Sequence, residues 1–245
     1  MSHRTINIAG IKSVLGYLFF IVLGSSAAPT AGPATTNPST FCSLRKDFQE
    51  YLHLPPVAFG RVFTIETMVQ LHSQSTLNAR IFDISRSTDI KNVSGVSEIL
   101  VVVDQLSISF YAYSQGIGVR NSYMNVVPLG TWLHVALRAQ ENTTTRRTLF
   151  ELILNNVVVE KITFPNLFPT VYYEFPYIGK SNWDGDPYPD MSISWFRIWN
   201  VSLSDSQLSS VAVNGVNRSI ATPIVAIKFW SLDLETNSPC NSTDE

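Results

Sequence analysis

The chain has 245 residues, a net charge of −2, 45% hydrophobic residues and only 15% charged residues. This composition excludes an intrinsically disordered chain and is sufficient for one large hydrophobic core. No cluster of positive charge is present beyond the pair Arg146–Arg147, so we expect no nucleic-acid partner.

The N-terminus has the organisation of a signal peptide over residues 1–27. The basic residues Arg4 and Lys12 precede a short apolar run, Val14–Leu23, and small residues follow it. The run is shorter than the about 20 residues of a membrane span. We therefore predict secretion, without membrane insertion if the signal is cleaved. An uncleaved signal anchor at the cell surface is the alternative.

Residues 28–40 are rich in Pro and Thr and predict a flexible mature N-terminus. One domain then follows over residues 41–240, with a short tail at 241–245. Cys42 and Cys240 bracket this domain, and in an oxidising compartment they predict a disulfide. Two buried free thiols are the alternative. Five glycosylation sequons agree with export, at Asn92, Asn142, Asn200, Asn217 and Asn241.

The domain reads as a succession of strands with polar turns. Residues 63–71 alternate between apolar and polar side chains, which is typical of a strand with one face in a core. Further β-rich runs predict strands at 81–84, 99–103, 106–111, 131–137, 149–154, 157–164, 171–178, 193–199 and 224–234. The tryptophans on these runs, Trp132, Trp195 and Trp199, are expected in the core. The pattern predicts an all-β, antiparallel two-sheet jelly-roll sandwich.

Two local motifs give this pattern more detail. Asn155–Asn156 separates two β-rich runs and predicts a tight hairpin, because Asn tolerates positive φ. Ser204 and Gln207 have the spacing of a capping box, which predicts one short helix from Asp205 to about Val211. Leu208 and Val211 of this helix would face a sheet.

Several of these segments resemble the laminin-G-like and pentraxin-like jelly rolls of the concanavalin A-like lectin/glucanase class. Gly130–Val135 (GTWLHV) is similar to a G-x-W-x-H-V strand of that family. Tyr177–Trp183 (YIGKSNW), Met191–Asn200 (MSISWFRIWN) and the LSDSQL helix follow in the family's order. The chain departs from the family's G-x-I-D at Met191–Ser194, where both Gly and Asp are missing. The Trp195–Phe196 doublet shifts the alternation, which a β-bulge or burial of both faces would explain.

The resemblance implies a fold shared by lectins, adhesion modules and glucanases, so function depends on the site residues. Glycoside hydrolysis needs two converging carboxylates, and the E-x-D-x-x-E motif of the related glucanases is missing. Asp233 and Glu235 share a strand face but lie near the chain end. An enzyme would instead need convergence among Glu66, Asp83, Asp104 and Glu151. His134 fits a structural role in its strand. We therefore expect no catalytic activity.

The segment 182–190 (NWDGDPYPD) contains the best candidate binding site. Trp183 and Tyr188 lie among three acids, and aromatic faces beside carboxylates suit sugar rings. The predicted ligand-binding residues are Trp183, Asp184, Asp186, Tyr188 and Asp190. Asp184, Asp186 and Asp190 also offer oxygen ligands for Ca²⁺, and a polar turn without a metal is the favoured alternative.

These observations favour a secreted, non-catalytic recognition module for an extracellular glycan or glycoprotein. A structural cell-surface or matrix domain that binds other proteins is the alternative, and a carbohydrate-active hydrolase is a weaker one. The sequence specifies neither the ligand nor the oligomeric state.

Overall fold

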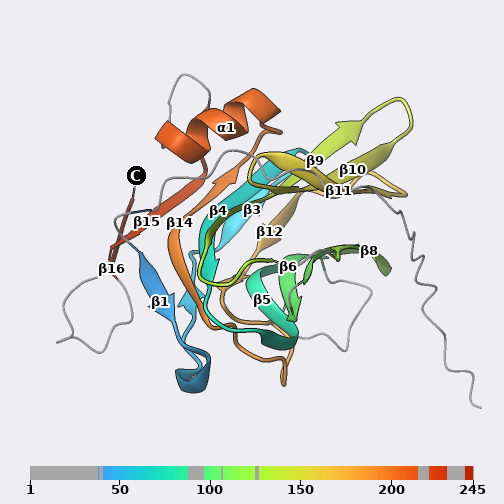
Figure 1. The fold of residues 1–245 in the computed structure, drawn as a ribbon. Coiled ribbons are helices and arrows are strands. Elements are labelled where there is room, and N and C mark those ends of the chain that lie inside the picture. Colours follow the sequence, from blue (N-terminus) through green and yellow to red (C-terminus); the bar gives the residue numbers. More distant parts are fainter. Residues whose placement is uncertain are drawn as a thin grey trace, which may run out of the picture.

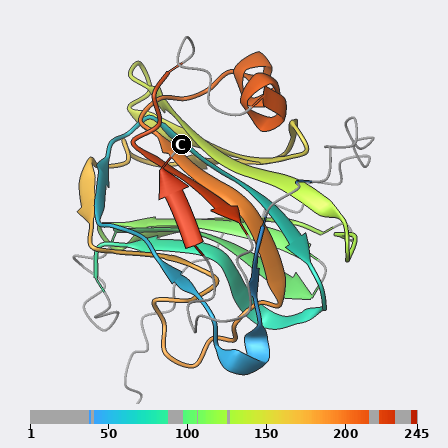
Figure 2. The ribbon, with the colours of Figure 1, turned by 90° about the vertical axis from the view of Figure 1, so that its left-hand side faces the viewer.

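The structure is a computed structural model that describes residues 38, 41–87, 97–105, 107–124, 127–214, 221–230 and 241–244. Within these ranges the strands form two large antiparallel sheets and one small one, stacked as a jelly-roll sandwich (Figures 1 and 2). The strand assignment confirms the predicted fold class. None of the helices described has the length and apolar character that crossing a membrane requires.

The larger sheet has eight strands among the described residues. In spatial order they are β11 (Val157–Phe164), β10 (Arg147–Leu154), β9 (Trp132–Asn142), β4 (Phe63–Leu71), β14 (Met191–Trp199), β15 (Val225–Trp230) and β16 (Asn241–Asp244), with β1 (Cys42–Leu44) also pairing with β14. Residues 241–244, which the sequence predicted as a short tail, thus form a strand of this sheet. Cα pairing of Trp230 with Asn241 joins β16 to β15.

The second sheet has six strands in the same ranges: β2 (Leu52–His53), β13 (Phe175–Ile178), β5 (Ser75–Ser85), β6 (Ser97–Gln105), β7 (Ser107–Ser114) and β8 (Ile117–Tyr123). A small two-stranded sheet pairs β12 (Val171–Tyr173) with β3 (Val57–Phe59). A short 3₁₀ helix, η1 (Lys46–Phe48), follows β1. The sequence missed β8 and the short strands β1, β2 and β3, because none of them has a long run of alternating apolar residues, whereas it predicted β12 and β13 as one strand over 171–178.

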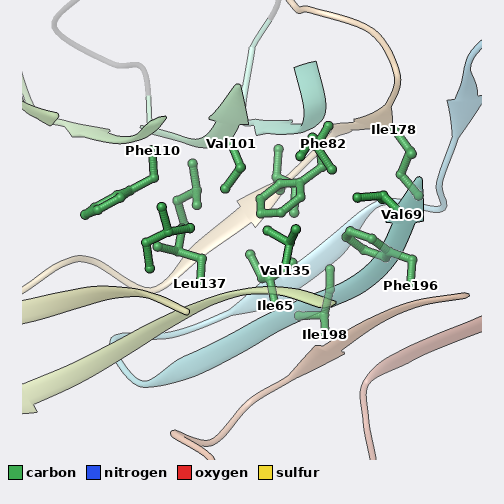
Figure 3. Close-up of a cluster of buried hydrophobic side chains, with 14 of the residues drawn as sticks. Ile65, Val69, Phe82, Val101, Phe110, Val135, Leu137, Ile178, Phe196 and Ile198 are labelled. Atoms are coloured by element: carbon green, nitrogen blue, oxygen red, sulfur yellow. The ribbon is translucent and has the colours of Figure 1, made fainter. Parts of the chain in front are cut away.

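The core lies between the two large sheets (Figure 3). The larger sheet contributes side chains from alternate positions of β4, β9 and β14, including Ile65, Val69, Val135, Leu137, Phe196 and Ile198. The facing sheet contributes Phe82, Val101, Phe110 and Ile178. Full burial of each such side chain stabilises the fold by about 1.5–3 kcal/mol. This face-to-face packing is the main energetic reason for the sandwich.

The local motifs take the predicted forms. Asn155 and Asn156 have φ values of 47° and 64°, so they make the tight turn between β10 and β11. The register of β14 against β4 shifts between Ile193 and Trp195, and every residue of β14 is buried. The doublet therefore combines a β-bulge with burial on both faces, the two explanations that the sequence left open.

The helix α1 (Asp205–Asn214) lies on the outer face of the larger sheet (Figure 1). Its capping box is present: the Ser204 backbone N–H donates to Gln207 Oε1 at 2.8 Å, and the Gln207 N–H donates to Ser204 Oγ at 3.3 Å. Leu208 and Val211 are buried against Trp199, as the sequence predicted for the helix face.

The prediction that the tryptophans are buried in the core is confirmed, but they belong to smaller clusters than the one between the sheets. Trp132, Trp195 and Trp199 are buried, but they lie outside the inter-sheet cluster. Trp199 packs under α1, whereas Trp132 and Trp195 form a separate cluster with Met68. Alternation explains the difference: the core-facing residues of β14 include Phe196 and Ile198, so Trp195 and Trp199 face the other way.

Candidate functional site

The candidate site is built around residues 179–190, the connection from β13 in one sheet to β14 in the other. Gly179 begins this loop with φ +75°, a conformation that L side chains rarely adopt. A Cβ atom there would come within 2.8 Å of Leu44 Cδ1. The Gly179 N–H donates to the Ile81 carbonyl oxygen at 3.1 Å, which fixes the loop to β5. The loop therefore starts from a rigid point.

A pocket of about 580 Å³ opens against this loop. Its lining combines two aromatic rings, acids, lysines and amides from the loop and from the segments around η1 and β5: Lys46, Gln49, Gln74, Lys180, Ser181, Trp183, Asp184, Gly185, Asp186, Pro187 and Tyr188. Trp183 is 42% exposed. The pocket has the size and mixed lining of a small-ligand site.

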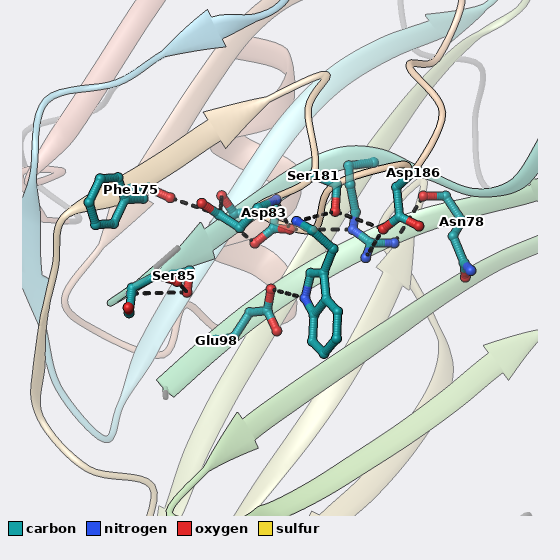
Figure 4. Close-up of polar contacts among 11 residues, drawn as sticks. Asn78, Asp83, Ser85, Glu98, Phe175, Ser181 and Asp186 are labelled. Carbon is teal, nitrogen blue, oxygen red and sulfur yellow. Dashed lines mark hydrogen bonds and ion pairs between the residues drawn. The ribbon is translucent and has the colours of Figure 1, made fainter. Parts of the chain in front are cut away.

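Buried polar contacts hold the pocket wall to β5 (Figure 4). Asp186 Oδ2 accepts hydrogen bonds from Arg80 Nη2 at 2.8 Å and from Ser181 Oγ at 2.7 Å. Ser181 Oγ in turn accepts the Trp183 backbone N–H at 3.0 Å. The Arg80 side chain is only 7% exposed, so solvent screens its attraction for Asp186 weakly. The loop conformation thus depends on an ion pair across more than a hundred residues of sequence.

Two buried acids complete this anchor. Asp83 on β5 accepts the Asn182 backbone N–H at 2.9 Å and its side-chain amide at 2.8 Å. Glu98 on β6 accepts the Trp183 indole N–H at 2.9 Å. The two acids lie diagonally across neighbouring strands on the same face of the sheet, and each affects the pKa of the other. We call Arg80, Asp83, Glu98, Asn182 and Trp183 the anchor cluster.

The anchor cluster holds its acids in an unusual protonation state. Loss of solvation on burial raises the pKa of Glu98 well above its ordinary value, and the neighbouring Asp83 charge raises it further. Burial also raises the pKa of Asp83, although the Arg80 charge and the Asn182 hydrogen bonds oppose this shift. Of the two carboxyl groups, Glu98 is the one whose protonated form these causes favour more strongly.

Aromatic rings outside the pocket lining contact two of its lining residues, Lys180 and Tyr188. The Lys180 ammonium lies 4.4 Å from the centroid of the Tyr51 ring and 4.6 Å from that of Tyr177. Tyr51 also contacts Tyr188, with ring centroids 6.3 Å apart. These cation–π and ring contacts position Lys180 and Tyr188 without using a carboxylate. The Tyr188 ring is therefore held in position by its contact with Tyr51.

Four of the five predicted ligand-binding residues line the pocket: Trp183, Asp184, Asp186 and Tyr188. Asp190 does not. Its backbone carbonyl accepts the His72 N–H at 2.9 Å, next to the start of β14. Binding by any of these residues stays a prediction.

Among the described residues, no three His, Cys, Asp or Glu side chains gather where they could hold a metal ion. Asp186 is paired with the Arg80 guanidinium, and a calcium ion on Asp186 would lie beside that positive charge. This arrangement fits a calcium site at Asp184, Asp186 and Asp190 poorly. The predicted calcium site remains an untested hypothesis.

The sequence did not predict the roles of Arg80 and Glu98, and it considered Asp83 only as an enzyme candidate. Each is a charged residue within a run of apolar strand residues, and that pattern is the signal that could have identified them. Their meeting depends on the β5–β6 register, in which Ser85 lies opposite Glu98 and Asp83 opposite Leu100. Residues on one face of adjacent strands then lie within reach.

Two of the other acids that the sequence considered for an enzyme, Glu66 and Glu151, have structural partners in the larger sheet. Glu66 on β4 accepts the Trp199 indole N–H at 2.9 Å and bonds to His134 Nε2 at 3.0 Å. His134 is fully buried there, which agrees with its predicted structural role. Glu151 pairs with Arg138 and Lys161 on the same sheet. Asp233, Glu235, Cys240, Asn92 and Asn217 lie outside the described residues.

The fold and sequence together define a laminin-G-like jelly roll. Residues 47–209 match a family model described as the concanavalin A-like lectin/glucanases superfamily. The match covers more than half of the chain, and the chain belongs to this superfamily. The match agrees with the resemblance seen in the sequence. No curated protein matches the chain significantly.

Solved structures share the fold at low sequence identity. Mouse laminin α1 domains LG4–5 match with a TM-score of 0.53 and 11% identity, over 73% of this chain and 46% of that one. Domain 4 of AbnA, an extracellular arabinanase of Geobacillus stearothermophilus, in complex with arabinotriose, has a TM-score of 0.51, 16% identity and coverages of 74% and 86%. The NanB sialidase of Streptococcus pneumoniae has a TM-score of 0.50, 13% identity and coverages of 70% and 27%. At these identities the similarity extends to the fold alone.

Proposed function

We propose that this protein is a secreted, non-catalytic recognition module that binds a glycan in the pocket beside residues 179–190. The observation that carries the proposal is the lining of this pocket, where Trp183 and Tyr188 stand with Asp184 and Lys180. Sugar rings present C–H faces that pack on aromatic rings and hydroxyl groups that bond to carboxylates and amines. The arabinotriose complex of a protein with the same fold agrees with this ligand class.

The positions of two glycosylation sequons support an open pocket. Asn200 follows the last residue of β14, whereas the binding loop precedes the first. A strand of nine residues is about 30 Å long. Asn142 ends β9 beyond Ala139, which pairs with Phe63 at the same far end of the sheet. Glycans on Asn142 and Asn200 would therefore leave the pocket accessible, which favours recognition over a purely structural role.

The geometry of the acids supports a role without catalysis. Asp83 and Glu98 lie on neighbouring strands behind the pocket wall, and they are only 0% and 3% exposed. Glycosidases hold their two carboxyl groups about 5–9 Å apart, with the sugar bond between them. Carboxyl groups buried to this extent leave no room for a substrate between them. We therefore infer that these acids support the loop.

A glycan array probed with the secreted chain tests the proposal. We expect one glycan class to bind, and Trp183→Ala to reduce its affinity at least tenfold, because the ring supplies the stacking surface. Tyr172→Ala is the matched control, since Tyr172 is 55% exposed on β12 and does not line the pocket. A blank array with a positive pull-down of an extracellular protein would favour the protein-binding alternative.

A further inference from the structure

The anchor cluster contains more acid than base. Its neighbourhood holds the carboxyl groups of Asp83, Glu98 and Asp186 and one guanidinium, that of Arg80. With all groups ionised, two uncompensated negative charges would lie in or beside a buried site, which is very unfavourable. One shared proton on the Asp83–Glu98 pair removes the repulsion between the two carboxyl groups that are in contact.

The groups around the pair do not change this balance. Tyr113 on β7 lies opposite Glu98, and Tyr177 on β13 lies opposite Asp83. Tyr111 on β7 lies opposite Leu100, and the Arg120 guanidinium from β8 stands 4.7 Å from its ring centroid. Burial raises the pKa of Tyr111, so it stays neutral in the physiological range. In the ranges described, Arg80 is thus the cation that contacts the carboxyl pair.

The pair is coupled to the pocket through the loop. Asp83 holds both amide groups of Asn182, and Glu98 holds the indole of Trp183, the residue that is 42% exposed at the pocket. Burial is the largest cause of the raised Glu98 pKa and outweighs the Trp183 hydrogen bond, which lowers it, so a charged Glu98 gains most from contact with water. Glu98 is only 3% exposed and bonds to the Trp183 indole, so we infer that such contact requires the indole to move. The orientation of the pocket wall therefore depends on the state of the pair.

We propose that the Asp83–Glu98 pair is a proton-controlled switch of the pocket: with one proton bound it holds Trp183 in place, and loss of that proton releases the Trp183 wall and weakens ligand binding. The effect on binding rests on the proposed glycan function. The movement of Trp183 does not, so the two are tested separately. If only the protonated form binds, affinity falls about tenfold for each pH unit above the pKa of the pair.

The first experiment uses no ligand. Acrylamide quenching of tryptophan fluorescence is measured against pH on the full secreted chain, and the Trp183 contribution is the difference from Trp183→Phe. We expect quenching of Trp183 to increase in one step with a midpoint well above 4.5, the ordinary value for a glutamic acid. Glu98→Gln should abolish the step, because the amide has no proton to lose in this pH range while its oxygen can still accept the indole N–H.

A matched control separates this pair from any other shifted acid. Burial also raises the pKa of Glu160 on β11. This residue accepts a hydrogen bond from Asn121 on β8, the edge strand of the second sheet. Glu160→Gln should leave the Trp183 step unchanged. A wild-type chain without the step, or a Glu98→Gln chain that keeps it, would show that the proposal is wrong.

Stability gives a second readout that does not depend on the variant folding. Glu98 has a folded pKa above its unfolded value, so its contribution to stability is complete below the unfolded pKa and is lost as pH rises through the folded pKa. Urea unfolding of the wild-type chain should therefore show stability decreasing over this window, and a flat profile would contradict the proposal. A Trp183 step without glycan binding at any pH would leave the switch in place and refute the proposed function instead.

Discussion

The two large sheets each bury a glutamate that accepts a tryptophan indole N–H at 2.9 Å, yet the two sites differ in every other respect. Glu66, on the larger sheet, lies beside His134 and Arg197, and its partner Trp199 is fully buried under α1. Glu98, on the second sheet, lies beside another acid, and its partner Trp183 is exposed at a pocket. The same glutamate–indole hydrogen bond thus occurs in the Glu66 site, where acid and base are balanced, and in the Glu98 site, where acids are in excess.

The comparison suggests a physical reason why the Glu66 site is structural and the Glu98 site is the proposed switch: the two differ in charge balance. In the first site, Glu66 faces the Arg197 guanidinium, so its carboxylate has a basic partner and its tryptophan is covered. A buried acid beside another acid must hold a proton, and a proton is exchanged with the solvent. The second site is therefore the one that responds to its surroundings.

Glu66→Ala and Glu98→Gln provide the largest contrast between the sites. We expect Glu66→Ala to lower the free energy of unfolding by about 3–5 kcal/mol, because the Trp199 indole loses its acceptor and the His134 and Arg197 partners lose their carboxylate. Glu98→Gln should change the free energy of unfolding by less than about 1 kcal/mol at mildly acidic pH, because the glutamine oxygen can still accept the Trp183 indole N–H. Urea unfolding followed by circular dichroism measures both. Equal losses would show that both sites are structural.

The predicted disulfide would add to the rigidity of the larger sheet. Cys42 is buried and pairs with Ile193 on the edge of β14 that also carries β15, and β16 begins one residue after Cys240. We expect peptide mapping to find Cys42 linked to Cys240. Replacing both by Ala should lower the free energy of unfolding by about 2–4 kcal/mol. Two alkylated cysteines in the secreted chain without prior reduction would contradict the disulfide.

The smallest expected effect concerns the glycans at the end of the larger sheet. Asn142→Gln and Asn200→Gln together should reduce the mass of the secreted chain and leave pocket affinity within about twofold, since β14 separates Asn200 from the loop by about 30 Å. Intact-mass spectrometry and a binding titration measure these effects. A large loss of affinity in a chain of unchanged stability would place the binding surface at the glycosylated end instead.

Much of the fold could be predicted because its determinants are local. Alternation over 63–71 gave β4, Asn155–Asn156 gave the hairpin turn, and Ser204 with Gln207 gave the start of α1. The tryptophans were harder. Trp195 and Trp199 sit on a strand buried on both faces, so hydrophobicity could not specify which face each ring occupies.

For the candidate site, the sequence predicted residues that line the pocket but not the buried residues that hold its wall in place. Trp183, Asp184, Asp186 and Tyr188 are close in sequence, and a short loop brings such residues together regardless of the rest of the fold. Arg80, Asp83 and Glu98 come from two other strands. Their contacts depend on strand register and on the path of the loop, which no local pattern encodes.

By itself, the sequence determined an all-β jelly roll, its hairpin and helix, and the loop with exposed aromatic and acidic residues, since each follows from periodicity or from turn chemistry over a few residues. Tertiary structure alone decided which acids meet. Whether a buried carboxyl faces a guanidinium or another carboxyl is a matter of a few ångströms between distant strands, and that distance sets its charge.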